Sequence, residues 1–431
     1  MDSTFFSFPI TDFNTTKQQV LNWINQFNTC CFLDNHQHHF NHQQYECIAA
    51  AGVTAMLQAN AGDALQQLKQ FQQIHTGWLF GHLGYDLKNE IEQLASAHPD
   101  GVGFPDLFFF VPQTVLLITP QKISITANSE KEAEQLLLDI TAIHIRNSAP
   151  AEEPITFQQR FSKADYLASI AQLQAHILRG DCYEINFCQE FFANNIQIHP
   201  IAAYERLSRL SPAPFAAFYK VDHKYLLCAS PERYLKKEGN RLISQPIKGT
   251  SKREADGVAD NQNKLALYNS AKDRSENVMV VDLVRNDLSR LCIPGTVQVE
   301  ELFGIYSFAQ VHQMISTIYG SLLPGLSLTD IIRSSFPMGS MTGAPKKKVM
   351  ELIEQYERSK RGIFSGAVGF IAPGGDFDFN VVIRSILYNE ERNYLSYQVG
   401  SGITFYSEPE AEYEECLLKA SAIKAVFATA T

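Results

Sequence analysis

The sequence favours an α+β fold, and three observations support this class for the chain of 431 residues. Short apolar runs of strand length recur, as at residues 30–33 and 114–118. Three more runs, at 366–371, 381–386 and 395–403, are separated by turn residues and predict an antiparallel meander. Amphipathic helices are scattered between the runs. These patterns are compatible with a fold of packed sheets, but they do not by themselves determine how the sheets are arranged.

Composition limits the classes of protein that are possible. With 45% hydrophobic residues, the chain can bury one large core or two moderate ones. The net charge of −10 argues against a nucleic-acid-binding surface. The eight cysteines include no Cys-x-x-Cys pair, so we expect reduced thiols. There is neither a basic N-terminal signal nor a membrane-length apolar run, and the prediction is a cytoplasmic protein.

The chain divides into two predicted regions. Residues 1–147 form a strand-rich first region, and residues 155–431 form the second. The segment 148–154 has two prolines, two acids and no apolar period, so it is the best linker candidate. Residues 77–86 alternate small and aromatic side chains, which is typical of a buried strand that another backbone approaches. Four histidines within 35–42 favour a polar loop over a metal site.

Several helices have marked ends. One is predicted from residue 165 to 179, where Gly180 ends it. Another is predicted to begin near Pro345 and to run to Arg361. A third, at the C-terminal end, begins with the capping-box spacing of Ser407 and Glu410.

The stretch 245–291 carries the most informative pattern. Residues 245–249 read as an extended segment that contains Lys248, and residues 272–287 read as a helix. Asp273, Glu276 and Asp287 fall on one side of this apolar helix. Because lone buried carboxylates are costly, the spacing leaves three interpretations open: a solvated edge, internal ion pairs, or a metal-binding or catalytic face.

Other candidate residues are ambiguous when each is taken alone. Lys248 fits an exposed strand lysine, and Glu232 after Ser-Pro fits a surface turn. The row Glu408, Glu412, Glu415 and Lys419 fits a solvated acidic helix face. The glycine-rich segment 339–343 can present backbone N–H groups to an anion, although it lacks the pattern of a phosphate loop.

Two features of the last strands point to an anion. Arg384 interrupts an apolar run, where an arginine is expensive without a partner. Gly400 and Gly402 leave backbone N–H groups approachable, as a carboxylate-binding site would require.

Together these motifs resemble the chorismate-utilising enzymes of the anthranilate synthase component I family. Pro-Ile-Lys-Gly-Thr surrounds Lys248, and Glu276 follows it 28 positions later in Asp-Arg-Ser-Glu-Asn. Ser-Pro-Glu-Arg at 230–233, the segment 336–346 and Glu-x-x-x-Lys-Ala at 415–420 also match. The lysine at position 248 resembles the aminodeoxychorismate synthase branch of the family, because anthranilate synthases typically have Ala at this position. The match is specific from about 161 to 420.

The resemblance implies a fold of two packed, mainly antiparallel β-sheets with helices on the outside. It also implies a site for chorismate amination to 4-amino-4-deoxychorismate, on the route to para-aminobenzoate and folate. The implied catalytic residues are Lys248 as a covalent nucleophile, Glu232 as the acid and His312 near the departing hydroxyl. The implied substrate-binding residues are Ser340, Arg384, Gly400 and Gly402, and the implied Mg²⁺ ligands are Glu276, Glu415 and Glu412.

The implied chemistry carries two further expectations. Covalent catalysis by Lys248 needs a neutral amine, so we expect its pKa to be lowered by burial or by nearby cations such as Lys252 and Arg253. No cysteine lies between glycines in the manner of a glutamine amidotransferase, so ammonia is expected from a separate glutaminase subunit.

The chain departs from the family pattern at three positions. Glu184 replaces a glutamine, Phe370 a tyrosine and Tyr406 an aspartate. The loss of the tyrosine hydroxyl predicts one hydrogen bond fewer to a substrate carboxylate.

The sequence leaves three alternatives open. The first is anthranilate synthase component I or another chorismate-converting enzyme. The second is a pyridoxal phosphate enzyme that uses Lys248 as a Schiff base, which would need a phosphate cradle. The third is a non-catalytic binding protein, against which the complete set of matched residues argues.

Overall fold

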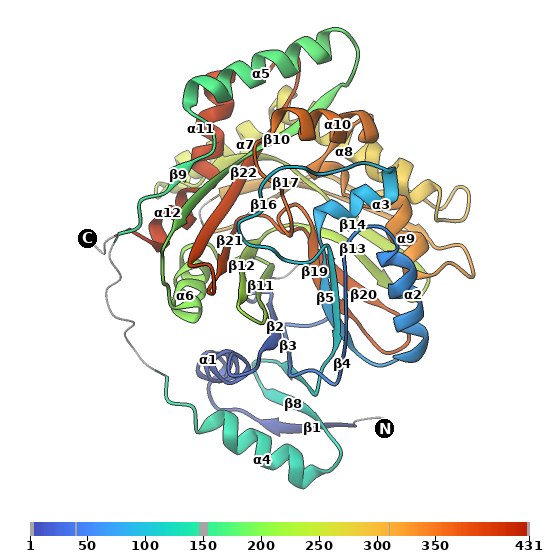
Figure 1. The fold of residues 1–431 in the computed structure, drawn as a ribbon, viewed down its shortest axis with the longest axis vertical. Helices are drawn as coiled ribbons and strands as arrows, with labels where there is room; N and C mark the ends of the chain where they lie inside the picture. The colour runs from blue at the N-terminus through green and yellow to red at the C-terminus, as the bar shows by residue number, and fades with distance from the viewer. Residues whose placement is uncertain (1–3, 39–40, 146–153, 310, 429–431) are drawn as a thin grey trace.

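Two antiparallel sheets packed face to face form the protein, and helices cover their outer faces (Figure 1). This is a computed structural model, and it describes residues 4–38, 41–145, 154–309 and 311–428. The strand pairs in both sheets are antiparallel among these residues. The predicted α+β class and the two-sheet arrangement are therefore confirmed.

The first sheet has the strand order β1-β8-β7-β3-β2-β11-β12-β21-β22-β10-β18, and β9 pairs with β10. Its strands are β1 Thr4–Pro9, β2 Thr29–Asp34, β3 Cys47–Ala51, β7 Thr114–Ile118, β8 Lys122–Ala127, β9 Gln158–Gln159, β10 Glu184–Asn194, β11 Phe215–Val221, β12 Lys224–Ser230, β18 Gly343–Ala344, β21 Ser385–Asn389 and β22 Tyr394–Ile403.

The second sheet has the order β15-β17-β14-β13-β20-β19-β5-β6-β4, and β16 pairs with β17. Its strands are β4 Ala55–Ala59, β5 Leu79–Leu83, β6 Leu107–Val111, β13 Arg233–Glu238, β14 Arg241–Gln245, β15 Ile247–Lys252, β16 Gln298–Ser307, β17 Val311–Ser321, β19 Ala367–Ile371 and β20 Phe377–Asn380.

Both sheets contain strands from each predicted region of the chain. In the first sheet β2 pairs with β11, and in the second sheet β5 pairs with β19. Residues 148–153 of the predicted linker lie outside the described residues. The close backbone approach predicted within 77–86 is present at Gly81 in β5, where an added Cβ would meet the carbonyl of Phe108.

The helices are α1 Phe13–Ile24, α2 Ala64–Ile74, α3 Lys88–Glu92, α4 Glu130–Thr141, α5 Lys163–Leu178, α6 Pro200–Leu210, α7 Gly257–Asn269, α8 Ala271–Ser289, α9 Leu328–Ser335, α10 Lys346–Tyr356, α11 Pro409–Lys419 and α12 Ser421–Val426, with short 3₁₀ turns at Tyr85–Leu87 and Gly339–Met341. The predicted helices at 165–179 and 272–287 correspond to α5 and α8. None of the helices in the described part of the chain combines the length and apolarity needed to cross a membrane.

Side-chain alternation along the strands builds two cores. On β2, Cys31 points into the core between the sheets, which also contains Phe80 and Phe109. Its neighbours Cys30 and Phe32 point the other way, into a core that α1, α4, α5, α6, α10, α11 and α12 cover. The first sheet is thus apolar on both faces, as a central layer must be.

The predicted meander at the C-terminal end is wrong in one respect. The chain leaves the second sheet after Asn380 and enters the first sheet at Ser385, so β19–β20 and β21–β22 are hairpins in different sheets. Residues 381–384 are therefore not a strand. Val381 and Val382 are apolar because they fill the core between the sheets.

Two predicted helix ends also differ. α10 stops at Tyr356 instead of Arg361, because Glu357 turns away to accept hydrogen bonds from the Arg361 guanidinium and the Cys188 N–H, 2.6 and 2.8 Å away. At α11 the predicted capping box is absent. The hydroxyl of Ser407 accepts from the Thr404 N–H, and Glu408 occupies the N-cap position without a side-chain hydrogen bond.

The histidine-rich segment is a polar loop, as predicted. His36 and His42 lie in turns between β2 and β3, and His38 lies in the irregular segment between them, whereas His39 lies outside the described residues. No group of three potential metal-binding side chains was found there or elsewhere among the described residues.

Candidate active site

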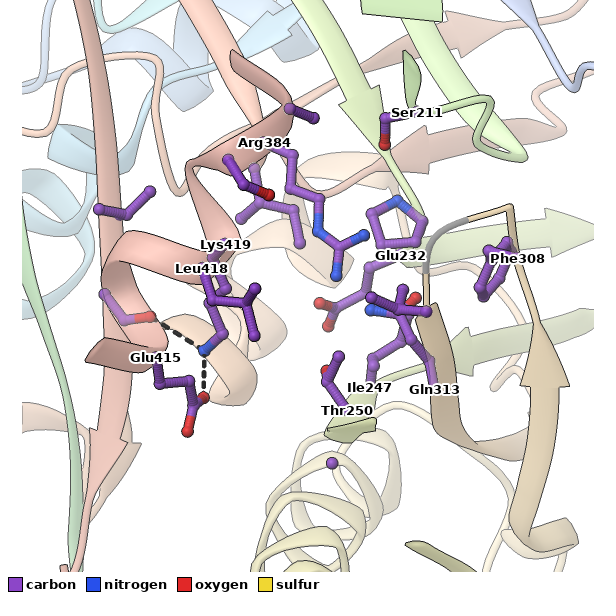
Figure 2. A pocket seen from close by; sticks show the side chains of 18 of the residues that line it. Ser211, Glu232, Ile247, Thr250, Phe308, Gln313, Arg384, Glu415, Leu418 and Lys419 are labelled. Atoms are coloured by element: carbon purple, nitrogen blue, oxygen red, sulfur yellow. Dashed lines mark hydrogen bonds and ion pairs between the residues drawn. The ribbon is translucent and has the colours of Figure 1, made fainter. Parts of the chain in front are cut away.

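A cavity of about 1200 Å³ brings together most of the predicted site residues. Its walls come from β15 and the start of α8 in one part of the chain and from β22 and α11 in another. Figure 2 shows Glu232 and Arg384 on one wall and Glu415 with Lys419 on the opposite wall. The predicted residues that line it are Glu232, Lys248, Glu276, Ser340, Arg384, Gly400, Gly402 and Glu415.

Lys248 lies in the cavity wall, and only 10% of its side chain is exposed. Its amine forms an ion pair with Glu184 from β10, so the pair joins the two sheets. Burial lowers the pKa of Lys248, but the carboxylates of Glu184, Glu276 and Glu415 outweigh burial and raise the pKa above its ordinary value. The expected lowering of this pKa is therefore wrong.

The two cations expected to lower that pKa form ion pairs with other carboxylates. Arg253 forms an ion pair with Asp260 at 2.8 Å. Lys252 is mostly exposed and lies 3.6 Å from Glu254. Both residues line the cavity, but neither is among the main influences on the pKa of Lys248.

Glu232 is buried, with 4% of its surface exposed, and is not the surface glutamate that its turn alone predicts. Burial raises the pKa of this carboxyl to about 7, although the Ser340 hydroxyl, Lys248 and Arg384 each lower it. A carboxyl with a pKa near neutral can hold or release a proton at physiological pH, which is the property of a general acid.

Arg384 lies where the chain crosses between the sheets, with a left-handed φ of 50°. Its guanidinium has no direct hydrogen bond or ion pair to any of the described residues, and it points into the cavity beside Glu232 (Figure 2). Burial lowers its pKa to about 10, and Glu232 opposes that lowering. A cation that lacks a direct partner and faces a cavity is placed to bind an anionic ligand.

Two helices contribute the predicted metal ligands. Glu276 on α8 is buried, and burial raises its pKa to about 7, while Lys248 opposes the rise and Glu184 adds to it. Glu415 on α11 forms an ion pair with Lys419 at 2.7 Å, which lowers its pKa. Glu412 is buried against Lys272 at 3.2 Å and does not line the cavity.

The residues present fit a hard divalent cation. One oxygen of Glu276, Oε1, is buried without a hydrogen-bond partner, and the Lys272 amine lies 3.9 Å from it. Glu276 and Glu415 both line the cavity and offer only oxygen donors, which Mg²⁺ prefers together with retained water and substrate oxygens. The described residues contain no cluster of three such ligands, so a bound ion would need further oxygens from water or substrate.

His312 is not among the residues that line this cavity. Its Nδ1 is 2.8 Å from the Ser307 hydroxyl, and its Nε2 is 3.1 Å from Asp260. Its neighbours on β17, Val311 and Gln313, do line the cavity, as strand alternation requires.

The three departures from the family pattern fall in different places. Phe370 packs between the sheets against Trp78 and does not line the cavity, so its missing hydroxyl is remote from it. Tyr406 is 82% exposed before α11. Glu184 is the direct partner of Lys248.

The sequence did not reveal the contacts of three charges at or behind the cavity wall. The family resemblance marked Glu184 as a replacement but did not pair it with Lys248, which is 64 positions away. Lys272 approaches Glu412 from another helix, and Lys419 donates to the Gly400 carbonyl at 3.0 Å. Of these three residues, only Lys419 had a signal in the sequence that pointed to the site, because it ends the acidic row of α11.

The fold and the cavity define a two-sheet α+β protein with a charged pocket suited to a small anion. A family profile described as "chorismate binding enzyme" matches residues 25–425. The chain belongs to this family, and the resemblance drawn from its motifs is confirmed.

Similar proteins include two with curated names. The chain is 35% identical over 347 residues to aminodeoxychorismate synthase component 1 of Salmonella typhimurium, covering 80% of this chain and 76% of that one. It is 31% identical over 348 residues to anthranilate synthase component 1 of Saccharolobus solfataricus, covering 81% and 80%. The crystal structure of anthranilate synthase component I from Streptococcus pneumoniae has the same fold, with a TM-score of 0.78, 24% identity and coverage of 90% and 94%.

Proposed function

We propose that this protein aminates chorismate with ammonia to give 4-amino-4-deoxychorismate, as an aminodeoxychorismate synthase component I and thus a transferase. The observation that carries the proposal is Lys248, which lines the same cavity as Glu232. Its motif resembles the branch of the family that has lysine at this position. The names of relatives such as the Salmonella protein support the same branch.

The proposed substrate is a compact dianion, and the charges in the cavity suit its binding. Arg384 and the N–H groups of Gly400 and Gly402 would hold the enolpyruvyl carboxylate, with Ser340 nearby. Glu276 and Glu415 would hold Mg²⁺, with Glu412 behind them as a supporting carboxylate. When bound, the cation supplies positive charge for the ring carboxylate in a protein whose net charge is −10.

The proposed reaction proceeds in two displacements. The neutral Lys248 amine forms a C–N bond to the ring while the C–O bond to the ring hydroxyl breaks, and Glu232 donates the proton with which that hydroxyl leaves as water. Ammonia then forms a new C–N bond and expels the Lys248 amine. Covalent catalysis of this kind divides one difficult substitution into two easier ones. His312 is proposed to act near the departing hydroxyl, although its side chain does not line the cavity.

Ammonia is proposed to come from a separate glutaminase subunit of the class I glutamine amidotransferase type, in the cytoplasm. The name "component 1" of the relatives supports a partner chain. If the purified chain were as active with glutamine as with ammonium, the separate subunit would be wrong.

The test is the product formed from chorismate, ammonium and Mg²⁺ by the wild type and by Lys248→Ala. We expect the para-amino product from the wild type and a loss of about 100-fold or more in Lys248→Ala, since the covalent route is removed. Formation of the same product at the same rate by the variant would refute the role of Lys248.

Anthranilate synthase component I is the second candidate, because relatives with that name cover a similar share of the chain. It places the amino group next to the ring carboxylate instead of opposite to it. The ring position of the amine in the purified product therefore decides between the two functions.

A further inference from the structure

The ion pair between Lys248 and Glu184 connects two elements that are distant in sequence. Lys248 is on β15 in the second sheet, and Glu184 begins β10 in the first. The Glu184 side chain is only 3% exposed. Gly402 on β22, next to Asn186 of β10, lies against both partners, and a Cβ there would meet the Lys248 amine and Oε1 of Glu184. The site is thus built around this pair.

Glu184 binds the Lys248 amine without itself lining the cavity. Lys248 lines the cavity, whereas Glu184 does not, so the carboxylate reaches the cavity only through the lysine. The second carboxylate oxygen of Glu184, Oε2, is buried and has no hydrogen-bond partner. A buried carboxylate with one unsatisfied oxygen is costly, so its presence calls for a reason other than stability.

We propose that Glu184 is a positioning residue that acts through Lys248: it fixes the place of the amine at the cavity wall and sets the pH at which that amine becomes nucleophilic. Only the catalytic consequence of this contact, the nucleophilic role of Lys248, rests on the proposed function.

Other charges also face Lys248, and Glu184 is distinguished from them by direct contact. Glu276 comes from α8, Glu415 and Lys419 come from α11, and Glu232 comes from the turn after β12. These groups act on the amine through space, whereas Glu184 makes the ion pair. Removing Glu184 therefore removes the largest single carboxylate effect on the protonation of Lys248.

The test is the reactivity of Lys248 toward an amine-acylating reagent, acetic anhydride, measured by peptide mass spectrometry between about pH 7 and 10. Wild type is compared with Glu184→Gln, and EDTA is present throughout. An opposite charge in contact shifts a pKa by one unit or more, so we expect Lys248 in the variant to react about tenfold or more faster at a given pH. The reactivity of Lys272 in the same samples should not change.

The matched control is Glu190→Gln. Glu190 is six positions further along β10, is equally buried, and pairs with Arg160 at 2.9 Å instead of Lys248. We expect its substitution to leave the acylation of Lys248 unchanged. Equal acylation of Lys248 in wild type and folded Glu184→Gln would overturn the proposal, with Glu184→Ala as the second variant if the first fails to fold.

Amination gives the second readout. Since the neutral amine reacts, the rising limb of kcat/KM with pH should move to lower pH by about one unit or more in Glu184→Gln. An unmoved limb would contradict the proposal. A wild type that forms no amination product would refute the proposed function instead, and the acylation result would still decide the role of Glu184.

Discussion

Glu232 and Arg384 show how burial sets the chemistry of single residues in this cavity. Burial raises the pKa of the Glu232 carboxyl to about 7 and lowers that of the Arg384 guanidinium to about 10. Burial disfavours the charged form of both groups. The attraction between the two opposite charges partly restores the charged form of each. An anion that enters beside Arg384 would favour the protonated form of Glu232, because like charges repel.

Glu232 gives a prediction about stability. Its carboxyl has a pKa of about 7 in the fold against an ordinary 4.5, so the folded state binds the proton more tightly than the unfolded chain. Its contribution to the free energy of unfolding therefore falls by about 3 kcal/mol as pH rises from 4.5 through 7. Glu232→Gln replaces the titrating carboxyl by an amide, so the variant lacks this pH-dependent loss of stability. In urea denaturation, the variant should gain stability relative to wild type between pH 5 and pH 8, and a constant difference would contradict the assignment.

Gly402 gives a second prediction at the same scale. In Gly402→Ala the new Cβ would displace the Lys248 amine or Glu184. A displacement of about 1 Å at a reacting group costs about 100-fold in rate, so we expect that loss in kcat while the fold is retained. Gly77→Ala, where nothing lies within 4 Å of an added Cβ, is the control and should keep full activity. Unchanged kcat in Gly402→Ala would place the reacting amine elsewhere.

At the scale of elements, α8 and α11 each bring one acidic face to the cavity. Glu276 from α8 and Glu415 from α11 are about 140 positions apart in sequence. Lys272 and Lys419 lie on the same two faces and offset part of their charge. The acidic row of α11 is therefore split between functions: Glu415 faces the cavity, whereas Glu412 is buried against Lys272.

These faces give a prediction about magnesium. Glu276→Gln or Glu415→Gln should raise the Mg²⁺ concentration for half-maximal amination by about tenfold or more, and EDTA should abolish the wild-type activity. Glu410→Gln is the control, because Glu410 is on α11 but pairs with Lys163 at 2.7 Å. A Mg²⁺ requirement that is equal in all four proteins would exclude this pair as the ligands.

At the scale of the whole molecule, the two sheets share one core, and strands of 1–147 complete both of them. The crossing at 381–384 is the point where the chain passes from one sheet to the other, and it carries Arg384 to the cavity. Because the lining strands β10 and β22 belong to one sheet and β15 and β17 to the other, the cavity depends on the packing of the two sheets.

The shared core gives a prediction about cooperativity. Phe109 is fully buried between the sheets, and Phe109→Ala should lower the free energy of unfolding by about 3–5 kcal/mol. Because both regions contribute to that core, circular dichroism and tryptophan fluorescence should report one transition, shifted together. Two separated transitions would show that the regions are stabilised independently.

By itself the sequence determined the local structure where a single pattern was sufficient. Helical spacing predicted α8, and strand-length apolar runs predicted β2 and β7, because period and length are properties of neighbouring residues. It failed at residues 381–386, where apolar residues fill a core without forming a strand, and at Ser407, whose hydroxyl caps a different turn. Motif resemblance supplied the site residues, eight of which line one cavity.

Only the tertiary structure decided which of these residues act on each other. The pairing of Lys248 with Glu184 and the burial of Glu232 depend on the packing of the two sheets. No spacing of residues along the chain encodes that packing. The same is true of protonation: the sequence predicted a lowered pKa for Lys248, whereas three surrounding carboxylates raise it. Electrostatic interactions act through space, so the charge of a buried group follows from the fold and not from its neighbours in sequence.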